Sequence, residues 1–188
     1  GDLDFRDVFI KTIPRGLKVK TLDLWGNKTL EHLPKMEAER IMANETNIET
    51  IEEGLKCTEL DLWGNKTLEH LPKIQANYIS VSRTNIETIS EGLQCESLNL
   101  RENKTLKYLP KIKVNMIMAS NTNIQRIADG LECKQLELEG NIALKTLPKR
   151  LKVDSLWLVN TYFSEKYTRE KIYKEIKSTG GEVNQIWI

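Results

Sequence analysis

One 14-residue segment occurs twice in this chain without a single change. The sequence LDLWGNKTLEHLPK occupies residues 22–35 and again residues 60–73, a spacing of 38 residues. Diverged copies follow at 98–111 (LNLRENKTLKYLPK) and 136–149 (LELEGNIALKTLPK), and a second unit containing TNIETIEEGL, TNIETISEGL or TNIQRIADGL fills the gaps. Two different 19-residue units therefore alternate, and a short fixed period indicates a stack of similar coils.

The apolar residues recur at the same places in every unit. Eight units begin at Leu17, Met36, Leu55, Ile74, Leu93, Ile112, Leu131 and Leu151, and only the seventh is one residue longer. Their third, sixth and eighth positions are apolar, and positions six and eight alternate with polar residues as in a half-buried strand. We predict a mainly β solenoid of about eight coils, with one strand per coil in a parallel sheet.

The eleventh position is polar in every unit. It holds Asn27, Asn65, Asn103 and Asn141 in odd units and Thr46, Thr84, Thr122 and Thr161 in even units. Such side chains can satisfy backbone groups at the turn after a strand, so we expect an inward polar ladder. A proline at positions 34, 72, 110 and 148 imposes an extended exit from each odd coil and excludes helix there.

The pattern L-x-L-x-x-N followed by L-x-x-L-P resembles the leucine-rich repeat. The short units and the recurrent Leu-Pro are most similar to repeats of bacterial effectors and to short repeats encoded by some bacteriophages, and the resemblance covers residues 13–163. It implies a leucine-rich-repeat solenoid with a concave parallel sheet. Because such effectors act mainly by binding host proteins, it also implies a protein-binding role. Some of them carry a separate ubiquitin-ligase domain, for which 188 residues leave no room.

The two ends of the chain depart from the repeat, and terminal coils of a solenoid need caps. We predict one continuous domain with an N-terminal cap at 1–16, repeats at 17–163 and a C-terminal cap at 164–188. Phe5, Val8, Phe9 and Ile13 are expected to cover the first coil. The C-terminal cap is predicted as a helix from Ser164 to Ser178, stopped by two glycines, and a last strand at 183–188, which makes this end α/β.

No pattern of reactive residues points to catalysis or to a metal. Cys57, Cys95 and Cys133 all occupy the third position of their units, where we expect small buried residues about 10 Å apart, too far for a disulfide. The same spacing separates His32 and His70, which we expect to be exposed and unable to chelate one ion. Because no catalytic or phosphate-binding motif occurs, we predict no enzyme activity, no metal and no cofactor.

Composition narrows the classes of partner. Lys and Arg number 28 against 27 Asp and Glu, so no overall field attracts nucleic acid, and a nucleic-acid partner is disfavoured. No apolar run approaches the ~20 residues of a membrane span, and the acidic start lacks the features of a signal peptide. We therefore expect a protein that does not contact a membrane. We expect it in the cytoplasm, which could be the cytosol of a host cell, and as a monomer by default.

The candidate binding site lies on the concave face. If positions six and eight point inward, positions five, seven and nine face outward from the sheet. Over the first four coils this face gathers residue types that are enriched at protein interfaces. The predicted contact residues are Trp25, Trp63, Met42, Tyr78, Arg40, Asp23, Asp61 and Glu59, with Arg101 farther along the column of Trp25 and Trp63.

Three functions remain open for this face. We predict a non-enzymatic protein-binding module, an effector or inhibitor that acts by occlusion. A nucleic-acid clamp would also use exposed aromatics, although the acidic neighbours count against it, and a carbohydrate-binding surface is the third class. Alternatively, the tryptophans lie flat on the sheet as scaffold, or were copied with the duplicated unit. Later units carry Arg101 and Glu139 at the same position, which argues against simple copying.

Overall fold

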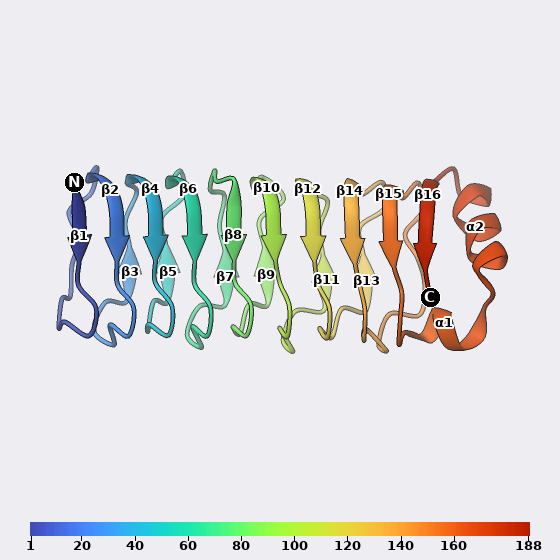
Figure 1. The fold of residues 1–188 in the computed structure, drawn as a ribbon, viewed down its shortest axis with the longest axis horizontal. Coiled ribbons are helices and arrows are strands. Elements are labelled where there is room, and N and C mark those ends of the chain that lie inside the picture. The colour runs from blue at the N-terminus through green and yellow to red at the C-terminus, as the bar shows by residue number, and fades with distance from the viewer.

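The computed structural model describes residues 1–188 and shows a solenoid in which successive coils contribute parallel strands to one sheet (Figure 1). The predicted fold class is confirmed. The ten strands follow chain order and are β1 (Asp2–Asp4), β2 (Lys18–Asp23), β4 (Glu37–Met42), β6 (Lys56–Asp61), β8 (Tyr78–Ser80), β10 (Gln94–Asn99), β12 (Lys113–Met118), β14 (Glu132–Glu137), β15 (Lys152–Trp157) and β16 (Glu182–Trp187).

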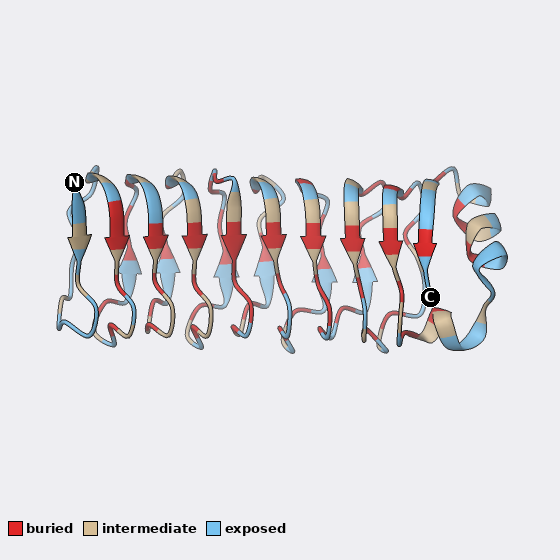
Figure 2. Ribbon diagram, viewed as in Figure 1, coloured by how far each residue is buried: buried red, intermediate tan, exposed pale blue.

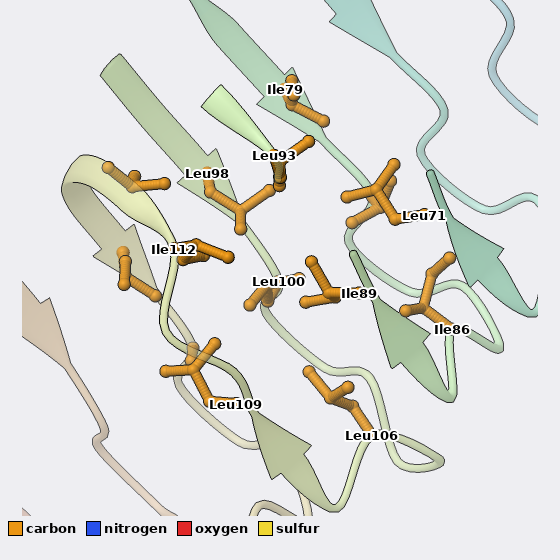
Figure 3. Packing of buried hydrophobic residues seen from close by; sticks show 14 of the residues in the cluster. Leu71, Ile79, Ile86, Ile89, Leu93, Leu98, Leu100, Leu106, Leu109 and Ile112 are labelled. Carbon is orange, nitrogen blue, oxygen red and sulfur yellow. The ribbon is translucent and has the colours of Figure 1, made fainter. Parts of the chain in front are cut away.

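The register places equivalent residues of neighbouring coils side by side. Leu98 of β10 pairs with Ile79 of β8 and with Ile117 of β12, and all three side chains are fully buried. Figure 2 shows this buried band running through the lower half of successive strands. Residues of later positions, such as Leu106 and Leu109, turn back toward Leu98 and close the core, as Figure 3 shows. The repeat period therefore produces one continuous apolar core.

The predicted polar ladder is confirmed inside the turns. Asn103 is fully buried, and its Oδ1 accepts hydrogen bonds from the Thr84 N–H at 3.0 Å and from the Thr84 hydroxyl at 2.7 Å. Its Nδ2 donates to the carbonyls of Val81 at 2.7 Å and Leu100 at 2.9 Å. Asn103 thus satisfies backbone groups of its own coil and of the preceding coil, while each threonine of the ladder donates to the carbonyl three residues before it.

Short strands on the opposite side of the coil pair two by two. They are β3 (His32–Leu33) with β5 (Thr50–Ile51), β7 (His70–Leu71) with β9 (Thr88–Ile89), and β11 (Tyr108–Leu109) with β13 (Arg126–Ile127). Glu52 N–H donates to the Leu33 carbonyl at 2.9 Å in the first pair. The equivalent donor for the Ile51 carbonyl would be Pro72, which has no N–H, so the ladder stops after every second coil. The prolines therefore divide the short strands on this side into separate two-stranded sheets, and they also exclude helix there.

The tenth position of each coil turns sharply with a left-handed backbone. Gly26, Gly64 and Gly140 supply it in some coils, with φ of 72°, 74° and 71°. Glu45 and Arg83 adopt the same conformation with φ of 54° and 55°, although non-glycine residues favour it less. The turn geometry is thus set by the repeat, while the side chain at this position varies between coils.

The N-terminal segment continues the sheet with an added strand. Leu3 of β1 pairs with Leu22, and Phe5 and Ile13 pack partly buried against the core. The prediction that Val8 and Phe9 cover the first coil is wrong, because Phe9 is 85% exposed and Val8 is also exposed. β1 is the edge strand of the sheet, so no further coil lies against this segment to cover the two side chains.

The C-terminal cap contains two helices where one was predicted. These are α1 (Tyr162–Lys166) and α2 (Arg169–Ser178), which lie beyond β16 at the end of the stack (Figure 1). Tyr167 is extended between them, and Thr168 begins α2 by accepting a hydrogen bond from Lys171 N–H at 3.4 Å. The helix breaks there because Thr168 acts as an N-cap. The predicted last strand is present as β16, and no helix is long and apolar enough to cross a membrane.

Candidate functional site

The ten-stranded sheet has an outer side, the sheet face, which points away from the core. It carries the side chains of positions five, seven and nine, while positions six and eight are buried beneath it. The predicted contact residues all lie on it, within or just beyond β2, β4, β6, β8 and β10. The repeat pattern alone therefore identified which side chains gather on this surface.

Trp25 and Trp63 stand in identical sequence segments but differ in exposure. Trp25 is 53% exposed, whereas Trp63 is only partly exposed. Their neighbours in the adjacent coils differ, and the Arg83 guanidinium lies 5.7 Å from the centre of the Trp63 ring. The two rings do not stack on each other, and Asn44 occupies the same position in the coil between them.

Each tryptophan is held by an aspartate two residues earlier. The Asp23 carboxylate accepts the Trp25 N–H at 3.1 Å, and the Asp61 carboxylate accepts the Trp63 N–H at 3.1 Å. Such a local bond fixes the backbone as it leaves the strand. Asp23 and Asp61 therefore orient the tryptophans, in addition to placing negative charge on the sheet face.

Asn44 carries a polar atom without a partner. Its Nδ2 donates to the Asp61 carboxylate at 3.1 Å, but its Oδ1 is buried and accepts no hydrogen bond. Buried polar atoms are nearly always satisfied, so this acceptor is an unusual feature between the two tryptophans. Nothing in the sequence pattern singled it out.

The other predicted contact residues form adjoining rows. Met42 lies between Asp23 and Asp61 in the register, and Arg40 pairs across the strands with Glu59. Glu59 is in turn aligned with Tyr78 of the next strand. Met42, Glu59, Asp61 and Tyr78 are partly exposed, while Arg40 is exposed and makes no ion pair. The structure thus brings these residues together around the tryptophans.

Arg101 differs from the other predicted contact residues because it is already paired. Its guanidinium lies 2.5 Å from the carboxylate of Glu137, two coils farther on. This pair is partly exposed, and such pairs contribute little to stability. Arg101 is consequently neutralised on the sheet face, whereas Arg40 is not.

A second aromatic group on the sheet face was missed as a site. Trp157 and Trp187 are aligned on β15 and β16, and their rings stack with centres 6.3 Å apart and planes 12° from parallel. Trp187 is 47% exposed. The predicted last strand contained the signal, but the pairing depends on the register of β16, which follows two helices and has no repeat to align it.

The cysteines and histidines form no reactive cluster. Cys57, Cys95 and Cys133 are free and pack against the core, but they are only partly buried where buried residues were predicted. Burial raises the pKa of all three thiols to about 12. His32 and His70 are exposed, and the Nδ1 of each lies 2.8 Å from a threonine hydroxyl. No group of three His, Cys, Asp or Glu is placed to hold a metal ion.

The function of this surface has to be argued from its own chemistry. Comparison with known protein families, with characterised proteins and with solved structures finds no match. The site that the geometry offers is therefore an exposed, partly aromatic and mainly acidic sheet face.

Proposed function

We propose that this protein is a leucine-rich-repeat binding module that captures another protein on its sheet face. Its repeats resemble those of bacterial effectors and of some bacteriophage proteins, and its role would be to occlude the surface that it covers. It would act without catalysis, in the cytoplasm or in the cytosol of a host cell. The residues proposed to carry binding are those around Trp25 and Trp63.

The observation that carries the proposal is the exposure of Trp25. A tryptophan that is 53% exposed leaves a large apolar area in water, and folding does not account for its position outside the core. Tryptophan, tyrosine and arginine dominate the binding energy of protein interfaces. Arg40, Trp63 and Tyr78 lie on the same face in the next three coils, so this part of the sheet face has the composition of an interface centre.

The charge of the sheet face favours a protein over a nucleic acid. Carboxylates at positions five, seven and nine outnumber arginines, and phosphates would be repelled by them. The acidic residues are Asp2, Asp4, Asp23, Glu59, Asp61, Glu137 and Glu139, and the arginines are Arg6, Arg40 and Arg101. The stacked pair of Trp157 and Trp187 also suits a sugar ring, so a carbohydrate remains the second candidate.

The test compares a double variant with a matched control. Trp25→Ala combined with Trp63→Ala should weaken binding of the partner by at least about 30-fold, which is about 2 kcal/mol, while the thermal midpoint changes little. Tyr108→Ala is the control, because Tyr108 is also exposed, at 39%, but lies on the opposite side in β11. Replacing Arg101 and Glu139 should matter less than replacing the tryptophans.

The partner is first isolated from host lysate on immobilised wild-type protein and identified by mass spectrometry. Affinities of purified partner for the wild type and the variants are then measured by calorimetry. Unchanged binding by the double variant would contradict the proposal, as would a thermal midpoint many degrees lower, which would assign the rings to the scaffold. Specific binding to a glycan array, abolished by loss of Trp157 and Trp187, would instead support the carbohydrate candidate.

A further inference from the structure

Trp63 shows how this protein itself covers a tryptophan of the sheet face. The Arg83 guanidinium lies 5.7 Å from the centre of the Trp63 ring. Arg83 is held there by Glu102, whose carboxylate accepts hydrogen bonds from Nε at 2.8 Å and from Nη2 at 3.0 Å. A planar cation over an indole, oriented by a carboxylate, is a favourable arrangement. It forms a Trp–Arg–Glu group across three successive coils.

Trp25 has the same local structure without the covering arginine. Residues 22–35 and 60–73 are identical, so any difference must come from neighbouring coils. Arg83 belongs to the coil after Trp63, at the tenth position, and the corresponding residue after Trp25 is Glu45. Backbone bonds show the equivalence, because Gly26 N–H donates to Asn44 O at 3.1 Å as Gly64 N–H donates to Ser82 O at 3.1 Å. The position that holds the Arg83 cation in the coil after Trp63 therefore holds the Glu45 anion in the coil after Trp25.

Both coils adjacent to Trp25 carry an acidic residue at the tenth position, Asp7 before it and Glu45 after it. Asp7 precedes it at the tenth position, and Asp7 N–H donates to the Trp25 carbonyl at 3.0 Å. The Asp7 carboxylate lies directly over Gly26, beside Trp25, whereas the Glu45 side chain lies over Gly64 of the following coil. Neither Asp7 nor Glu45 forms an ion pair. The surroundings of Trp25 thus contain an exposed indole, the Asp7 carboxylate without an ion pair, and Arg6, which is already paired with Asp4 and Asp23.

We propose that Trp25 binds an arginine side chain of the partner protein, in the way that Trp63 holds Arg83. This inference rests on the proposed function and specifies its partner, which would present at least one exposed arginine to the N-terminal part of the sheet face. Asp7, whose carboxylate lies over Gly26, supplies an acceptor for a guanidinium beside Trp25, and Glu45 in the following coil adds negative charge. Arginine suits the site better than lysine, because its planar guanidinium stacks on an aromatic ring.

The probe for a direct test is a short glycine peptide with one central arginine, compared with the same peptide containing neutral, nearly isosteric citrulline. Binding is followed by the NMR signal of the Trp25 indole N–H, assigned from the Trp25→Phe variant. The arginine peptide should shift this signal and should bind about two- to fivefold more tightly than the citrulline peptide, the size expected for a cation over an exposed ring. High salt should weaken the binding, because the site is exposed. Equal shifts with both peptides would overturn the proposal.

Two reciprocal variants make the test specific. Glu45→Arg should abolish the response of Trp25, because it puts an internal guanidinium where Arg83 stands in the other copy, and Arg83 with φ of 55° shows that arginine fits this backbone. Arg83→Ala should uncover Trp63 and add a second indole signal that responds to the peptide. Glu45→Gln, which removes only the charge, should give a partial loss. An unchanged Trp25 response in Glu45→Arg would refute the proposed site.

Failure of this inference can be distinguished from failure of the proposed function. If the Trp25 and Trp63 double variant loses the partner while the arginine peptide never perturbs Trp25, the sheet face binds a protein but not through arginine. If the peptide binds as expected while the double variant retains full affinity for the partner, the arginine site exists and the proposed function is wrong.

Discussion

Leu98→Ala tests the inward register at the centre of the stack. The Leu98 side chain has 0% exposure and lies between Ile79 and Ile117 on the adjoining strands. Removing its outer methyl and methine carbons loses about 2 kcal/mol of transfer free energy, at about 0.8 kcal/mol per carbon. The cavity adds to this loss, because strands bonded on both sides cannot close around it. We expect an unfolding free energy lower by about 2 to 5 kcal/mol.

The measurement is a denaturant titration followed by circular dichroism, with the thermal midpoint as a second readout. A loss of 3 to 4 kcal/mol should lower the midpoint by roughly 10 °C for a chain of this size. Leu3→Ala is the matched control, because Leu3 occupies the same repeat position in β1 but is only partly buried. It should cost less than half as much. A loss below about 1 kcal/mol for Leu98→Ala would refute the inward register.

Three further results are expected. The thiols of Cys57, Cys95 and Cys133 should react slowly with a thiol reagent at pH 8 and quickly in urea, because burial raises their pKa to about 12 from 9.0. Rapid modification of all three thiols in the native protein would contradict this expectation. Since the folded state favours the protonated thiol, the contribution of these thiols to stability should be complete below pH 9.0 and lost as the pH rises toward about 12. Asn103→Leu should cost roughly 2 to 4 kcal/mol in a urea titration, because it leaves buried backbone groups unsatisfied, and a neutral effect would exclude a structural role for the ladder. His70→Ala should change the unfolding free energy by less than about 0.5 kcal/mol, so a large loss would reveal an unrecognised contact.

The sequence was most informative where the repeat holds. Leu98 could be assigned to the core, and Asn103 to the polar ladder, because a solenoid places the same position of each unit in the same environment. The membership of Trp25 and Trp63 in one surface column followed from the same period. Where the repeat ends, inference was weaker. Phe9 proved to be exposed, and Thr168 divided the predicted C-terminal helix.

Pairwise contacts between coils could not be deduced from the columns. The position of Arg83 over Trp63 depends on a left-handed turn and on Glu102 in the following coil, neither of which the pattern of apolar residues specifies. The stacking of Trp157 on Trp187 likewise required the register of a strand that follows two helices. These contacts join residues 20 to 30 positions apart and involve side chains that no repeat rule constrains.

The period of the sequence by itself determined the solenoid, the direction of each strand and the division between core and sheet face, because burying apolar residues at a fixed spacing permits only one register of coils. Only the tertiary structure decided which of two identical tryptophans is covered. Trp25 and Trp63 have the same neighbours along the chain, and the difference between them arises from Glu45 and Arg83 in the adjacent coils. Exposure is a property of the folded surroundings, so identical segments acquire different surfaces when their neighbours differ.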